Sequence, residues 1–115
     1  MAVVQSVEGA GPWARIRFSG EIDVATTDLV RETIAATLAD HSEASVLEID
    51  VAGVSLIDST GVGVLVAAHR TLADSGVRLL VTNPSKIVER VMKVTGVFDV
   101  LTGSGISARP RRGPR

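Results

Sequence analysis

The stretch Val54-Ser55-Leu56-Ile57-Asp58-Ser59-Thr60-Gly61-Val62-Gly63 decides the fold of this chain. The apolar run at 46–51 before it predicts a strand, and residues 64–73 after it are long and apolar enough for a helix. Small polar residues lie where that helix should begin. We expect Asp58 or Ser59 to cap its first turn, whose backbone N–H groups are free to bind an anion. A hydroxyl beside a carboxylate at a helix N-terminus marks a candidate site.

Two strands joined by a Gly- and Pro-containing turn are expected before this region. Residues 3–8 contain three valines, and residues 14–19 alternate between apolar and polar side chains. We expect residues 20–23 to break the second strand. Asp23 then caps a helix over 24–39, in which apolar residues recur at helical spacing.

The alternation in the second strand gives it one basic face. Arg15 and Arg17 lie on that face, and Glu48 and Asp50 occupy the matching positions of strand 46–51. If these strands are neighbours, the arginines can pair with the carboxylates. The sequence therefore predicts a sheet with one polar, solvated face and one apolar face covered by helices.

Further elements follow the helix that begins near Ser59. Gly76 should end that helix, and residues 77–82 predict a strand. Asn83 is the expected cap of a helix over 84–95 with the apolar stripe Ile87, Val88, Val91 and Val94 or Thr95, and residues 97–101 are expected to form a last short strand. Strands that alternate with helices predict an α/β fold: one domain with a mixed sheet of four to five strands and helices mainly on one face.

Composition limits the function. The 115 residues suit one domain, and 45% hydrophobic with 3% aromatic residues predicts an aliphatic core. Residues 1–102 carry 8 of the 12 basic and all 13 acidic residues, which argues against nucleic-acid binding. No run approaches the ~18 apolar residues of a membrane span, so we expect a cytoplasmic protein with a domain at 1–103 and a disordered basic tail at 104–115.

Catalytic patterns are incomplete. Ser59 lacks the Gly-x-Ser-x-Gly frame of a hydrolase, and His69 lies about three helical turns beyond it. The run 58–61 has one residue too many for the Asp-Ser/Thr-Gly of aspartic proteases, and Gly61-Val62-Gly63 is too short for a dinucleotide loop. There is no cysteine and no metal-ligand spacing. We expect no enzymatic activity, no cofactor and no metal.

Three motifs together resemble a known family. They are Gly20-Glu21-Ile22-Asp23, the central run from Leu56 to Leu65, and Thr95-Gly96-Val97-Phe98. On these motifs the chain resembles a STAS domain, specifically a bacterial anti-sigma factor antagonist, over residues 3–102. The resemblance implies a non-enzymatic binding protein. Its unphosphorylated form binds an anti-sigma factor, which is a serine protein kinase, and frees the sigma factor.

The resemblance also implies how this binding is switched. Ser59 is the residue that the anti-sigma factor phosphorylates, and a PP2C-type phosphatase removes the phosphate. Thr60 stands where many relatives have a second serine and is a second possible acceptor. We expect a monomer when no partner is bound. The implied partner-binding residues are Glu21, Asp23, Asp58, Ser59, Thr60, Gly61 and Gly63.

Other interpretations of the same motifs stay open. Asp58 and Ser59 could simply cap a helix, which is the commonest use of these residue types. The chain could be a STAS subunit of a membrane lipid-transport ATPase complex, or a STAS domain that binds nucleotide. We further expect Gly61 to let a partner approach the backbone, so that Gly61→Leu keeps the fold and weakens binding.

Overall fold

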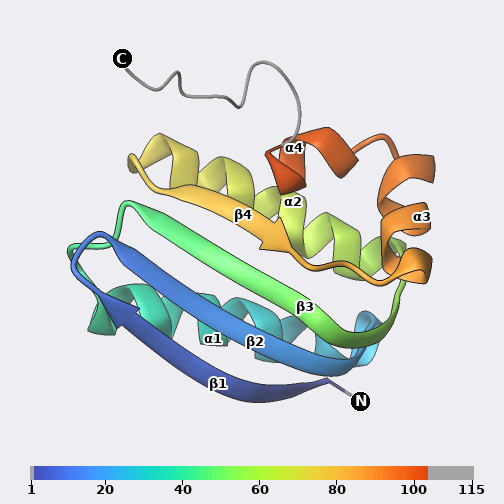
Figure 1. Cartoon of the computed structure of the whole chain (residues 1–115), viewed down its shortest axis with the longest axis horizontal. Coiled ribbons are helices and arrows are strands. Elements are labelled where there is room, and N and C mark those ends of the chain that lie inside the picture. Colours follow the sequence, from blue (N-terminus) through green and yellow to red (C-terminus); the bar gives the residue numbers. More distant parts are fainter. Residues whose placement is uncertain (1, 104–115) are drawn as a thin grey trace.

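A single mixed sheet organises the molecule. The computed structural model describes residues 2–103. Its strands are β1 (Val3–Ala10), β2 (Trp13–Ile22), β3 (Val46–Ile57) and β4 (Arg78–Thr82), and they lie side by side in that order (Figure 1). β1 is antiparallel to β2, whereas β2, β3 and β4 are parallel to one another. The expected mixed α/β sheet is confirmed, with four strands in the described part of the chain.

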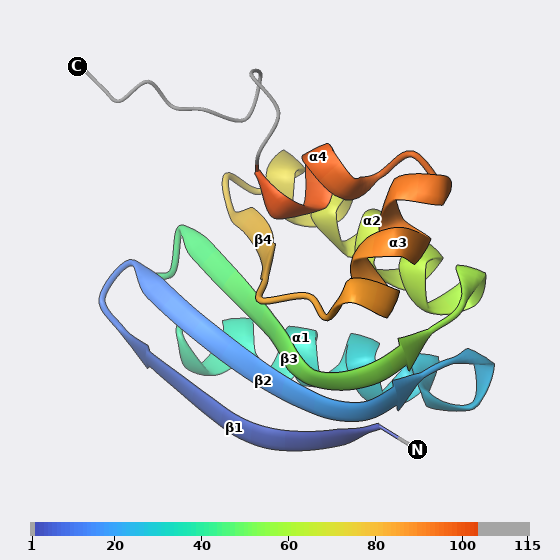
Figure 2. The same ribbon diagram turned by 45° about the vertical axis from the view of Figure 1, so that its right-hand side comes forward.

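The helices connect and flank these strands. The 3-10 turn η1 (Val24–Thr26) and α1 (Thr27–Asp40) join β2 to β3, and α2 (Ser59–Asp74) joins β3 to β4. Figure 1 shows α1 and α2 together behind the sheet, and Figure 2 shows α3 (Lys86–Val94) and α4 (Phe98–Thr102) grouped with α2 beyond β3. No helix among residues 2–103 is both long and apolar enough to cross a membrane.

The core lies between the sheet and these helices. Alternate residues of β2 point into it, so Ala14, Ile16 and Phe18 are fully buried, as the alternation predicts. The helices close the core with aliphatic side chains such as Val30 from α1 and Leu65 from α2. An aliphatic core built with very few aromatic residues is therefore confirmed.

The opposite face of the sheet carries paired charges. Arg15 lies beside Glu48 in the strand register and Arg17 beside Asp50. The Arg15 Nε to Glu48 Oε1 distance is 3.1 Å, and the Arg17 Nε to Asp50 Oδ2 distance is 3.4 Å. The predicted cross-strand pairing of arginines with carboxylates is confirmed.

Two strands are longer than their sequence indicates. β2 continues through Gly20 and Glu21 to Ile22, although we expected residues 20–23 to break it. β3 likewise runs to Ile57 and pairs with this extension, with Gly20 beside Val54 and Ile22 beside Ile57. Pairing with a neighbouring strand offsets the weak strand propensity of glycine, and the pairing register shifts on both sides of Gly20.

The C-terminal elements require three corrections. Ser85, not Asn83, caps α3, because its hydroxyl accepts the Val88 N–H at 3.3 Å. Asn83 instead has a left-handed backbone (φ 57°) and donates from Nδ2 to Asp50 at 3.2 Å. With the helix placed this way, Val88 and Met92 face the core, while Ile87 and Val94 of the expected stripe are 57% and 80% exposed.

The third correction concerns residues 97–101, which we expected to be a strand. They begin α4, whose first turn is closed by the Leu101 N–H bonding the Val97 carbonyl at 2.9 Å. Leu101 is fully buried, and this anchors the short helix against the rest of the core. The expectation for residues 104–115 lies outside the described residues.

Candidate functional site

Asp58 fixes the start of α2. It has extended backbone angles (φ −106°, ψ −177°), and its Oδ1 accepts the Gly61 N–H at 2.9 Å and the Thr60 hydroxyl at 2.6 Å. The Thr60 hydroxyl and then the Gly61 N–H hold the pKa of Asp58 below its ordinary value, so the carboxylate stays ionised. Asp58 is therefore the N-cap, and Ser59 is the first residue of the helix.

The loop after β2 is joined to this turn. The Asp58 N–H donates to the Ile22 carbonyl at 3.2 Å. Asp23 caps η1 by accepting the Ala25 N–H at 3.0 Å. Asp23 thus caps a 3-10 turn that leads into α1, rather than a continuous helix over 24–39. These bonds place the end of β2, which carries Glu21, and the loop residue Asp23 beside the start of α2.

Ser59 and Thr60 differ in the freedom of their hydroxyls. Both residues are exposed. The Thr60 hydroxyl is committed to Asp58 at 2.6 Å, whereas the Ser59 hydroxyl makes no hydrogen bond to another residue within 2–103. An accessible, uncommitted hydroxyl beside an ionised carboxylate can accept a phosphoryl group.

The two glycines in this region have different surroundings. Gly61 is buried, and a Cβ built on it would lie 2.7 Å from the Ile22 carbonyl oxygen. The backbone that approaches Gly61 closely is therefore the end of β2. This overturns our expectation that Gly61→Leu keeps the fold. Gly63 is exposed, with nothing within 4 Å of a built Cβ, so its backbone is open to an approaching molecule.

Sequence reasoning missed two apolar residues and one cation near the site. Val24 is 71% exposed and Leu56 is 43% exposed, although both are large aliphatic residues. Arg31 lines a hollow of about 410 Å³ that Thr60 and Gly63 also line. Of these residues, only Val24 could have been recognised from the sequence. It lies six positions before Val30, whereas the buried residues of α1 follow one another at intervals of three or four positions.

No group of three or more His, Asp or Glu side chains within residues 2–103 could hold a metal ion. His69 lies on α2, about three turns beyond Ser59. It is therefore too far away to act as a base toward the Ser59 hydroxyl.

Known proteins are similar to this chain in sequence and in fold. The STAS domain family matches residues 3–109. The anti-sigma-B factor antagonist of Listeria monocytogenes is 36% identical over 83 residues, which cover 72% of this chain and 71% of that protein. The chain therefore belongs to the STAS domain family and, within it, to the anti-sigma factor antagonists.

Solved structures agree with this placement. An anti-sigma factor antagonist from Mycobacterium paratuberculosis matches with a TM-score of 0.72 and 26% identity, over 84% of this chain and 80% of that one. The Bacillus cell fate determinant SpoIIAA, solved in its phosphorylated form, matches with a TM-score of 0.63 over 83% of this chain and 86% of that one. At 23% identity, the likeness to SpoIIAA supports the fold alone.

Proposed function

We propose that this protein is a cytoplasmic anti-sigma factor antagonist whose binding is switched off by phosphorylation of Ser59. In its unphosphorylated form it binds an anti-sigma factor, a serine protein kinase, and so releases a sigma factor. The kinase transfers the γ-phosphoryl group of ATP to the Ser59 hydroxyl oxygen; ADP leaves, and the hydroxyl proton passes to a base of the kinase. A PP2C-type phosphatase hydrolyses the phosphate and restores binding.

The observation that carries this proposal is the difference between Ser59 and Thr60. The hydroxyl of Ser59 is exposed and uncommitted, whereas that of Thr60 is held by Asp58. Transfer to Thr60 would require breaking a hydrogen bond to an ionised carboxylate, which is stronger than a bond between neutral groups. Ser59 is therefore the preferred acceptor.

A phosphate at Ser59 favours the free protein over the complex. It adds about −1.5 to −2 charges at pH 7, which the start of α2 tolerates. In a complex the same charge would be desolvated beside the exposed Val24 and the carboxylates of Asp23 and Asp58. An unpaired buried charge costs several kcal/mol, and each 1.4 kcal/mol is tenfold in affinity, so a loss of ~100-fold or more is expected.

The test uses the purified anti-sigma factor of the organism that encodes this chain. With ATP, mass spectrometry should find phosphate on Ser59 in the wild type and in Thr60→Ala, and none in Ser59→Ala. By calorimetry, Ser59→Ala should bind like the wild type, and Ser59→Asp should fold but bind poorly. Phosphate on Thr60 alone, or tight binding by the phosphorylated protein, would refute the assignment.

A further inference from the structure

One side of α3 presents aliphatic side chains to solvent. Ile87, Val91 and Val94 recur at intervals of four and three positions, so they lie along the same side of the helix. This side is distinct from the core-facing side, which carries Val88 and Met92. Val94 is the most exposed large apolar side chain within residues 2–103, and Ile87 is more than half exposed. Their alignment distinguishes them from the single apolar residues found on most protein surfaces.

A row of cations runs beside these aliphatic residues. Lys86, Arg90 and Lys93 have the same spacing one position earlier in the sequence, and all three are exposed. Lys93 bonds Glu89 at 2.7 Å and lies 4.9 Å from the centre of the Phe98 ring. Lys86 and Arg90 form no ion pair with another residue of 2–103. Three cations and one carboxylate leave α3 with a net positive charge.

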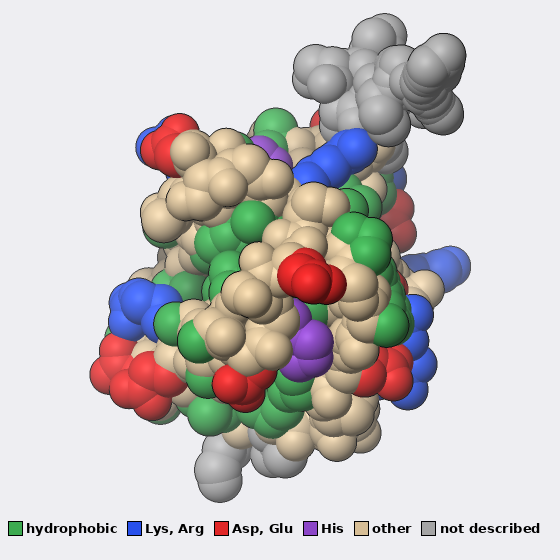
Figure 3. Space-filling view, turned by 90° about the vertical axis from the view of Figure 1, so that its left-hand side faces the viewer, with side chains coloured by type: hydrophobic (Ala, Val, Ile, Leu, Met, Phe, Trp, Pro, Cys, Tyr) green, Lys and Arg blue, Asp and Glu red, His purple; other side chains and the backbone are tan. Residues whose placement is uncertain are grey.

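The charge of the chain is divided between its two parts. Residues 86–115 carry 7 of the 12 basic and 2 of the 13 acidic residues, whereas residues 1–85 carry 5 basic and 11 acidic ones. Figure 3 shows the end of the molecule opposite α3, where acidic side chains are spread over the surface. An anionic surface would therefore be attracted to α3 and repelled by the rest of the protein, which sets the direction of its approach.

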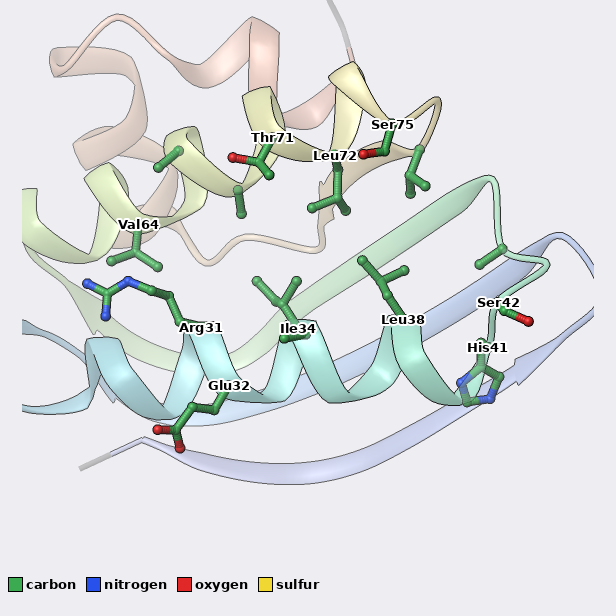
Figure 4. A pocket seen from close by; sticks show the side chains of 15 residues that line it. Arg31, Glu32, Ile34, Leu38, His41, Ser42, Val64, Thr71, Leu72 and Ser75 are labelled. Carbon is green, nitrogen blue, oxygen red and sulfur yellow. The ribbon is translucent and has the colours of Figure 1, made fainter.

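The aliphatic side of α3 differs from the other apolar surface of the molecule. The hollow of about 790 Å³ between α1 and α2 has aliphatic walls that point toward one another and are already buried, among them Ile34, Val64 and Leu72 (Figure 4). Val94, in contrast, protrudes from the helix with 80% of its surface exposed. Protruding side chains suit a soft, extended surface into which they can insert.

These observations favour one kind of occupant over three others. A second copy of the chain in a two-fold interface would bring its own cations against Lys86 and Arg90, which is repulsive. Nucleic acid attracts cations through its phosphates, but exposed aliphatic side chains beside them would gain little. A protein partner needs about 800 Å² on each side, more than a helix of nine residues presents. A bilayer with anionic lipids offers both headgroup phosphates and an acyl boundary.

We propose that α3 binds the surface of a membrane that contains anionic lipids. Ile87 and Val94 enter the boundary between headgroups and acyl chains, and Lys86 and Arg90 contact the headgroup phosphates. The four arginines of residues 109–115 add to the same attraction. Each cation near such a surface contributes about fivefold in binding, so the association is reversible and weakens as salt is added.

Co-sedimentation of the full chain with lipid vesicles tests the role of charge. The wild type should sediment with vesicles of equimolar phosphatidylcholine and phosphatidylglycerol and stay in solution with phosphatidylcholine alone. Arg90→Glu should lower binding to the mixed vesicles by about tenfold or more. Arg70→Glu makes the same charge change at an exposed residue of α2 and should stay within about threefold of the wild type. Both variants should keep the wild-type melting temperature, because exposed substitutions cost little.

Fluorescence tests whether the aliphatic side of α3 enters the bilayer. Because the chain has no cysteine, Val94→Cys and Val24→Cys can each carry one environment-sensitive label at a highly exposed position. On the mixed vesicles the emission of the label at position 94 should shift to shorter wavelength, as expected in an apolar environment. The emission of the label at position 24 should stay as in water.

Three results would overturn this inference. They are equal binding to both kinds of vesicle, wild-type binding by Arg90→Glu, and a label at position 94 that stays in water on the mixed vesicles. If a DNA duplex at the same salt displaced the protein from the mixed vesicles, nucleic acid would be the preferred occupant and the inference would again be wrong. None of these measurements includes the anti-sigma factor, so their failure leaves the proposed switch at Ser59 unchanged.

Discussion

Gly61 and Gly63 lie two positions apart on α2 and should respond in opposite ways to an added methyl group. At Gly61 a Cβ would lie 2.7 Å from the Ile22 backbone carbonyl, so Gly61→Ala should destabilise by about 1–3 kcal/mol. At Gly63 the space is open, and Gly63→Ala should stabilise the free protein by up to about 1 kcal/mol. Urea unfolding of the two variants measures both effects. If the two variants unfolded at the same urea concentration, the contrast between a confined Gly61 and an open Gly63 would be wrong.

The carboxylate of Asp58 should make stability depend on pH. Its pKa is lowered in the folded protein, first by the Thr60 hydroxyl and then by the Gly61 N–H. The stabilisation is therefore complete above the unfolded-state pKa of about 4 and is lost as the pH falls through the lower folded-state pKa. An asparagine in place of Asp58 would still cap the helix but would carry no charge.

The measurement is the free energy of unfolding of the wild type and Asp58→Asn as a function of pH. Between about pH 5 and pH 2 the wild type should lose its advantage over the variant. Above that range the difference between the two proteins should be constant. Parallel curves through the acid range would show that Asp58 makes no net charge contribution.

At the scale of single elements, α3 tests which residue begins a helix. Ser85 accepts the Val88 N–H, so Ser85→Ala should cost about 1 kcal/mol of stability, and Ser85→Asp should retain the cap. In a domain of this size 1 kcal/mol lowers the melting temperature by roughly 4–8 °C. Differential scanning calorimetry of both variants measures these melting temperatures. If Ser85→Ala melted at the wild-type temperature, Ser85 would not stabilise the protein as the N-cap of α3.

At the scale of the whole molecule, residues 104–115 should be dispensable for stability. They contain four arginines and one large aliphatic residue, Ile106, and so offer little apolar surface to bury. A chain that ends at Gly103 should melt like the full chain. A fall of about 5 °C or more, the scale of ~1 kcal/mol in a small domain, would contradict this expectation.

Alternation and capping in the sequence were enough to predict the class of fold and the start of α2. The two-residue period of β2 and the start of β3 placed Arg15 against Glu48, because side chains of neighbouring strands meet in register. Asp58, two small polar residues and Gly61 located the start of α2. The motifs around Asp23 and Ser59 indicated the family, but local spacing alone left the cap and the switch as alternatives.

Only the tertiary structure decided features that depend on contacts between distant residues. β2 passes through Gly20 because β3 pairs with it, and no local propensity reports that pairing. Gly61 is confined by Ile22, which is remote in sequence. The sequence alone therefore could not distinguish the role of Gly61 from that of Gly63. A hollow of about 790 Å³ between α1 and α2 is lined by residues of both helices, which are far apart in the sequence. Local chemistry predicted most of the elements and the start of α2; the packing of those elements decided which residues around that start are buried and which are exposed.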